Sequence, residues 1–172
     1  MTARPAGLLV VALAACAPRR PATADVSSPD VSSPTPVVTL ERTPCFGTCP
    51  VYTVSISASG TVRFLGRNHV SKEGEATAEI PRATVDSLLR QLEAGGYFDF
   101  ADAYVMDSPA CGQYATDSPT VITSVTVGGR SKTIRHDYGC FAAPAELARL
   151  ERMIDDVAGT SRWTSSGPPD RQ

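Results

Sequence analysis

The chain has 172 residues, a net charge of −2, 42% hydrophobic residues and 20% charged residues. These values predict one ordinary globular domain, because domains usually contain about 100–200 residues. The near balance of charges argues against a nucleic-acid-binding protein, which normally carries a basic stripe. No apolar run reaches the ~20 residues that a membrane-spanning helix requires.

The first residues have the organisation of an export signal. Arg4 is their only charge, and residues 6–15, which follow it, are uncharged and mostly apolar. This apolar segment is too short to span a bilayer, and a proline- and arginine-containing segment comes directly after it. The sequence therefore predicts a signal peptide over residues 1–15.

The residues Leu13-Ala14-Ala15-Cys16 resemble the lipobox of bacterial lipoproteins. In that family the signal peptide is cut before the cysteine, whose thiol carries diacylglycerol and whose amine is acylated. The resemblance implies lipidation of Cys16 and a firm membrane anchor, because each buried CH2 contributes about 0.8 kcal/mol. Ala17 stands where an Asp would resemble the inner-membrane retention signal, so we expect an outer-membrane lipoprotein facing the periplasm. A plain secretory signal is the alternative.

The residues after the predicted cleavage site are poor in groups that a core can bury. Residues 17–36 contain five prolines, four serines and no aromatic residue. This composition predicts a lipidated cysteine and a disordered tether over residues 16–36. Residues 164–172 are predicted to form a similar polar tail, which leaves 37–163 as a single folded domain.

The first half of this domain predicts strands followed by a helix. Residues 52–57 alternate between apolar and polar, Ala58-Ser59-Gly60 is typical of a turn, and residues 61–65 are predicted to return as a second strand. Residues 37–40 are predicted as an edge strand before this hairpin, and residues 75–80 as a further strand. The next helix is expected between Pro81 and Gly95-Gly96, with one apolar stripe formed by Val85, Leu88, Leu89 and Leu92. The aromatic residues that follow it are expected to plug the core: Tyr97, Phe98 and Phe100.

The second half repeats the pattern. Residues 121–127 and 131–137 are predicted to form a hairpin around Gly128-Gly129. A second helix is expected from Pro144 to Gly159, with Leu147, Leu150, Ile154 and Val157 on one face. The predicted fold class is α+β, with an antiparallel sheet built from two hairpin-plus-helix halves and the helices on one face.

Four cysteines remain when Cys16 is assigned to the lipid. Outside the cytoplasmic membrane we expect them to oxidise, and four cysteines allow three connectivities. The favoured pairing is Cys45–Cys49 with Cys111–Cys140, because Cys111 and Cys140 flank the second hairpin and Gly47 allows a tight turn in the short ring. On the chain-entropy model, closing these two loops stabilises the fold by about 2 and about 3.6 kcal/mol, respectively. The crossed pairings remain open alternatives.

The motif Cys45-Phe46-Gly47-Thr48-Cys49-Pro50-Val51-Tyr52 resembles the bacterial family called domain of unknown function 6438. Residues 59–62, 116–119 and 136–139 also resemble that family, and the resemblance covers roughly residues 38–160. The family has no assigned activity. The resemblance therefore implies a fold and a bacterial context but no chemistry.

The spacing Cys-x-x-x-Cys-Pro with a distant histidine is also similar to copper-delivery proteins of cytochrome oxidase assembly. Two thiolates and an imidazole suit copper, so an alternative copper site is formed by Cys45, Cys49 and His136. The two cysteines alone are an alternative site for thiol redox chemistry. In those copper proteins the motif opens a helix of a thioredoxin fold. Here Pro50 leads into an alternating strand, which disfavours this alternative.

Other candidate chemistry is weak. The acidic residues near the middle of the chain do not have the alternate spacing of a calcium loop: Asp99, Asp102, Asp107 and Asp117. Ser108 and Ser118 each precede a proline outside any strand-turn-helix elbow. We therefore expect no enzyme, no cofactor, no bound metal and no nucleic-acid partner. The expected function is a non-enzymatic envelope lipoprotein that binds an unidentified envelope protein or ligand, or supports envelope assembly.

Overall fold

The computed structural model describes residues 1–2 and 35–164. The predictions for the signal peptide, Cys16, nearly all of the tether and the tail beyond Thr164 lie outside these residues. The described part is an α+β fold with a seven-stranded sheet and three α-helices. Its elements are, in chain order, β1 (Pro36–Arg42), β2 (Val51–Ser57), β3 (Thr61–Asn68), β4 (Gly74–Glu79), α1 (Arg82–Ala94), the 3-10 turn η1 (Tyr97–Asp99), β5 (Ala103–Tyr104), β6 (Thr120–Val127), β7 (Arg130–Asp137), α2 (Ala145–Ala158) and α3 (Ser161–Thr164).

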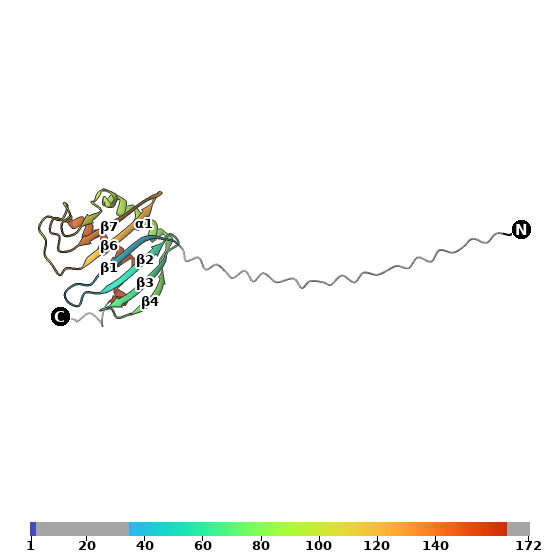
Figure 1. Cartoon of the computed structure of the whole chain (residues 1–172), viewed down its shortest axis with the longest axis horizontal. Helices are drawn as coiled ribbons and strands as arrows, with labels where there is room; N and C mark the ends of the chain where they lie inside the picture. Colours follow the sequence, from blue (N-terminus) through green and yellow to red (C-terminus); the bar gives the residue numbers. More distant parts are fainter. Residues whose placement is uncertain (3–34, 165–172) are drawn as a thin grey trace. The chain divides into compact units, whose positions relative to one another are not determined.

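The strands follow the order β4-β3-β2-β1-β6-β7-β5 across the sheet (Figure 1). Every neighbouring pair is antiparallel except β5 with β7, which is parallel. Most of the sheet is therefore made of hairpins that are local in sequence, and β1 with β6 is the long-range pairing that joins them.

Strand β1 corrects the sequence prediction, which placed residues 37–40 at an edge of the sheet. The strand is central, because Leu40 pairs with Val54 of β2 on one side and with Thr123 of β6 on the other. Val38 and Leu40 are both fully buried. The pairing with β6 joins segments about 80 residues apart, and the local pattern of β1 carries no information on such a partner.

Two predicted strand pairs, β2 with β3 and β6 with β7, and the two predicted helices α1 and α2 are present in the structure. Gly128 and Gly129 connect β6 to β7 with φ angles of 57° and 78°, the left-handed values that a two-residue type I′ turn requires. Helix α1 begins after Pro81 and ends at Gly95. Helix α2 begins after Pro144, and Gly159 ends it in the left-handed conformation.

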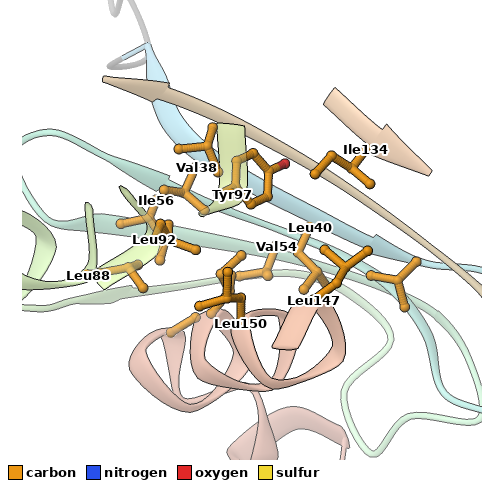
Figure 2. Packing of buried hydrophobic residues seen from close by; sticks show 14 of the residues in the cluster. Val38, Leu40, Val54, Ile56, Leu88, Leu92, Tyr97, Ile134, Leu147 and Leu150 are labelled. Carbon is orange, nitrogen blue, oxygen red and sulfur yellow. The ribbon is translucent and has the colours of Figure 1, made fainter. Parts of the chain in front are cut away.

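The core combines alternate residues of the strands with the apolar stripes of α1 and α2. Figure 2 shows Leu147 and Leu150 of α2 pointing toward Leu40 and Val54 of the sheet. Tyr97 of η1 is fully buried in this cluster, as its aromatic character predicts, and its hydroxyl shares a hydrogen bond of 2.7 Å with Thr123. Phe98 and Phe100 are only partly buried against the core.

The two ends of the sheet differ. At one end lie the turns 58–60 and 128–129 together with Pro36, where β1 begins. At the other end lie the short β3–β4 connection, residues 69–73, and three longer connections, residues 43–50, 105–119 and 138–144. The three longer connections are called the loop end below. In Figure 1 strand β1 runs toward this end from right to left. Across the described residues, no helix has the length and hydropathy needed to cross a membrane.

Candidate functional site

Two disulfides hold the loop end. Cys45 is bonded to Cys49, and Cys111 to Cys140, with Cα atoms 5.8 and 4.7 Å apart. This pairing agrees with the one favoured from the sequence. The first disulfide closes a five-residue ring at the surface, and the second ties loop 105–119 to loop 138–144.

Backbone hydrogen bonds join the three loops into one unit. The Phe46 N–H donates to the Asp117 carbonyl at 3.0 Å, which links loop 43–50 to loop 105–119. The Phe141 N–H donates to the Gln113 carbonyl at 3.0 Å, and Ala115 donates to Gly139 at 2.9 Å. The loops have little regular structure of their own, so these bonds and the disulfides fix their shape.

Large apolar side chains project from this unit into solvent. Phe46 is 91% exposed, Phe141 is 68% exposed and Met106 is 56% exposed. One of the three comes from each loop of the loop end. Scattered single apolar residues are normal on a surface, but two exposed phenylalanines and a methionine on neighbouring clamped loops are typical of a contact surface for a partner.

The charge of the loop end has one sign. Its three loops contain Asp107 and Asp117 and no lysine, arginine or histidine. Both aspartates are exposed, with positive φ angles of 66° and 71°. The loop end therefore offers apolar contacts beside negative charge, a combination that favours a partner carrying basic residues.

A largely buried polar network lies where the strands meet the loop end. Arg42, the last residue of β1, donates from Nε and Nη2 to Asp155 Oδ2 of α2 at 2.9 and 2.6 Å. The Tyr52 hydroxyl donates to Asp155 Oδ1 at 2.6 Å. Burial alone would lower the pKa of the Arg42 guanidinium, but the Asp155 carboxylate together with Tyr52 and Tyr138 outweighs burial, and the pKa is raised. Burial, reinforced by Asp155, raises the pKa of Tyr52.

The network continues to a buried histidine. Arg42 Nη1 donates to the Tyr138 hydroxyl at 3.5 Å, and this hydroxyl donates to Glu151 Oε2 at 3.0 Å. Glu151 Oε1 lies 2.9 Å from His136 Nδ1. Glu151 is 1% exposed and His136 is 4% exposed. Both groups have hydrogen-bond partners, as buried polar groups require, and the network fixes α2 against the ends of three strands.

The sequence interpretation missed this network, although one signal of it was present. Glu151 lies four residues after Leu147 and directly after Leu150, within the apolar stripe of α2. A carboxylate in a buried stripe needs a partner. His136, named from the sequence as an alternative copper ligand, is buried and lies 2.9 Å from Glu151 of α2.

The structure does not bring together the metal ligands that the sequence suggested, Cys45, Cys49 and His136. Among the described residues, no group of three or more His, Cys, Asp or Glu side chains is arranged to hold a metal ion. Cys45 and Cys49 are bonded to each other, while His136 bonds to Glu151. His69 is exposed in the connection between β3 and β4.

The described residues form a small α+β domain whose loop end carries exposed apolar side chains on loops held by two disulfides. The family model described as Domain of unknown function (DUF6438) matches residues 36–158. The chain belongs to this family, which confirms the resemblance of the cysteine motif. A search of curated proteins gave no match to the chain.

Proposed function

We propose that the chain is a cell-envelope lipoprotein that binds another envelope component through its loop end and catalyses no reaction. The observation that carries this proposal is the exposure of Phe46, Met106 and Phe141 on loops that two disulfides hold in place. A rigid surface of this kind loses little conformational freedom on binding, and aromatic side chains contribute most to contact energies.

The direction of β1 is compatible with the lipid anchor proposed at Cys16. Strand β1 begins at Pro36, at the end of the sheet remote from the loop end. A tether from Cys16 would therefore join the domain at this remote end and not at the loop end. The residues between Cys16 and β1 can span up to about 60 Å at ~3.1 Å per residue.

We also infer that α1 and α2 cover the same face of the sheet, each following its own hairpin. The apolar residues of both helices share one core with alternate strand residues, among them Ile56 and Ile134. On the intervening positions, side chains such as Thr39 and Ser124 are partly exposed. The second face then remains open to solvent.

The alternative is copper binding or thiol redox at Cys45 and Cys49. It requires these cysteines to be reduced in the protein as cells make it. Counting free thiols in the isolated protein and titrating it with Cu(I) separates the two functions. Four oxidised cysteines without tight Cu(I) binding would agree with the proposed role in binding an envelope component. Two free thiols together with tight Cu(I) binding would instead favour the copper function.

The proposal is tested by photo-crosslinking in the bacterium that makes the protein. A photoreactive amino acid is placed at Phe46 or Phe141, and at Ala58 as the control, because Ala58 is exposed in a turn at the opposite end of the sheet. We expect a discrete adduct from positions 46 and 141 and none from position 58. The adduct from position 141 should also disappear when Phe46→Ser is introduced.

The variant Phe46→Ser is suitable because the side chain is 91% exposed. Its loss should change the free energy of unfolding by less than about 0.5 kcal/mol. Equal adducts from all three positions, or an adduct from position 141 that survives Phe46→Ser, would show that the loop end is not the contact surface.

A further inference from the structure

A second surface lies on the side of the sheet that faces away from the core. A groove of about 200 Å³ crosses β2, β3 and β4 there, lined by Thr53, Ser55, Arg63, Leu65, Arg67 and Glu75. The strand register places Thr53, Leu65 and Glu75 side by side in one row across the three strands. Two arginines of β3 flank this row, with Leu65 midway between them along the strand.

Arg67 covers part of this row. Its guanidinium donates to Glu41 Oε1 of β1 at 2.9 Å. Because β2 lies between β3 and β1, and Glu41 pairs with Thr53 in the register, the ion pair spans β2 beside Thr53. Thr53 Oγ1 is consequently buried, and it has no hydrogen-bond partner among the described residues. A buried hydroxyl without a partner is rare in native structures and unfavourable.

Arg63 supplies a second unused donor. Its side chain is exposed, and within residues 35–164 no hydrogen bond or ion pair occupies it. The Arg63 guanidinium therefore lacks an acceptor at the surface of the groove, and the Thr53 hydroxyl lacks one beneath Arg67. Arg67 and Glu41 form an exposed and hence weak ion pair, so a ligand reaches the hydroxyl when the Arg67 side chain swings off it. A carboxylate fits this set, because its two oxygens match the planar guanidinium and one of them can also accept from a hydroxyl.

The charges and the size of the groove restrict the ligand further. Arg67 is already paired with Glu41, so Arg63 is the arginine of the groove left without an anionic partner, and a single negative charge balances it. A phosphate dianion would repel Glu75. The volume corresponds to about seven water-sized groups at roughly 30 Å³ each, which suits one small residue. Leu65 offers an apolar contact, and Ser55 can bond an amide.

We propose that this groove binds the C-terminal residue of a peptide through its free carboxylate. The carboxylate lies between Arg63 and the Thr53 hydroxyl, and a small side chain packs on Leu65. This site is separate from the loop end, since none of its residues belongs to loops 43–50, 105–119 or 138–144.

The first test compares N-acetyl-glycyl-alanine with its C-terminal amide, which differs only in the charge and acceptor oxygens. Binding to the purified ¹⁵N-labelled chain is followed by amide chemical shifts, with propionate as a free carboxylate without a peptide bond. We expect the acid to shift signals of β2, β3 and β4, the amide to have no effect, and propionate to bind more weakly. Equal shifts with the amide, stronger binding of propionate, or shifts outside the groove would overturn the proposal.

The second test uses variants. Arg63→Gln should weaken binding of the peptide acid about tenfold or more, because it removes a charge-assisted hydrogen bond, whereas Arg90→Gln on the exposed surface of α1 should leave it unchanged. Thr53→Val should weaken binding and, without peptide, should leave the urea midpoint unchanged or raise it, since it removes a buried unpartnered oxygen. A lower midpoint with unchanged affinity would make Thr53 structural and refute its role as a ligand donor.

Discussion

The two disulfides should differ in how much they stabilise the fold. The double variant Cys111→Ala/Cys140→Ala opens a bridge between residues separated by 29 positions, and Cys45→Ala/Cys49→Ala opens one between residues separated by 4. On the chain-entropy model these loops are worth about 3.6 and about 1.9 kcal/mol, respectively. The loop lengths alone therefore predict a difference of about 1.7 kcal/mol in the free energy of unfolding.

Burial increases the expected difference. Cys111 and Cys140 are 2% and 4% exposed and belong to the hydrophobic core, whereas Cys45 and Cys49 are only partly buried. Replacing the buried pair by alanine also leaves a cavity where the sulfur atoms packed, which adds to the entropic loss. We expect the buried bridge to contribute at least about 2 kcal/mol more than the surface ring.

Urea unfolding of both double variants and the unmodified chain under non-reducing conditions measures these values. Loss of the longer loop should also increase the slope m, because the unfolded chain becomes less compact. Equal losses of stability in the two variants, or a larger loss for the pair Cys45 and Cys49, would refute the reasoning. Peptide mapping of the unreduced protein provides the control, since a fragment joining Cys45 to Cys111 or Cys140 would invalidate the pairing.

Three further outcomes follow from the structure and the sequence. Glu151→Leu should lower the free energy of unfolding by about 3–5 kcal/mol because it leaves buried His136 unpaired, and adding His136→Phe should restore much of this in urea unfolding; additive losses would contradict the pairing. Burial raises the pKa of Tyr97, so near pH 10 only the unfolded chain releases the proton of this hydroxyl. The free energy of unfolding should therefore fall above that pH by about 1.4 kcal/mol per pH unit, and Tyr97→Phe should reduce the slope of unfolding free energy against pH. Cys16→Ser should abolish membrane association in cell fractionation, and a variant that stays with the membranes would contradict the lipid anchor.

The elements with local signals were predictable from the sequence. Gly128-Gly129 fixes its hairpin turn because both residues need positive φ. Pro81 and Gly95 bound α1 for reasons that lie within a few residues of each end. The central position of β1 was not predictable in this way, because it depends on β6, a strand about 80 residues away that pairs with it only in the folded chain.

The candidate sites also include features that were predictable from the sequence and features that were not. The cysteine pairing followed from separation along the chain and from the hairpin between Cys111 and Cys140. The exposure of Phe46 and Phe141 was not evident, because a phenylalanine beside a cysteine is as typical of a core as of a surface. The groove was missed for a different reason: Arg63 and Thr53 lie on separate strands, and only the register of β2 with β3 brings them together.

The two disulfides at the loop end would favour the proposed binding of a partner, although this surface has no regular secondary structure. Loop 105–119 has fifteen residues outside any helix or named strand, and ordering each of them costs about 1–2 kcal/mol of backbone entropy. If this ordering occurred during association, it would oppose binding. Here the Cys111–Cys140 bridge and the hydrogen bonds from Ala115 and Phe141 impose the order during folding. The network from Arg42 to His136 holds the underlying strand ends against α2, so the exposed aromatic side chains rest on a fixed base. A reduced Cys111–Cys140 pair should consequently weaken partner binding even under conditions in which the domain stays folded.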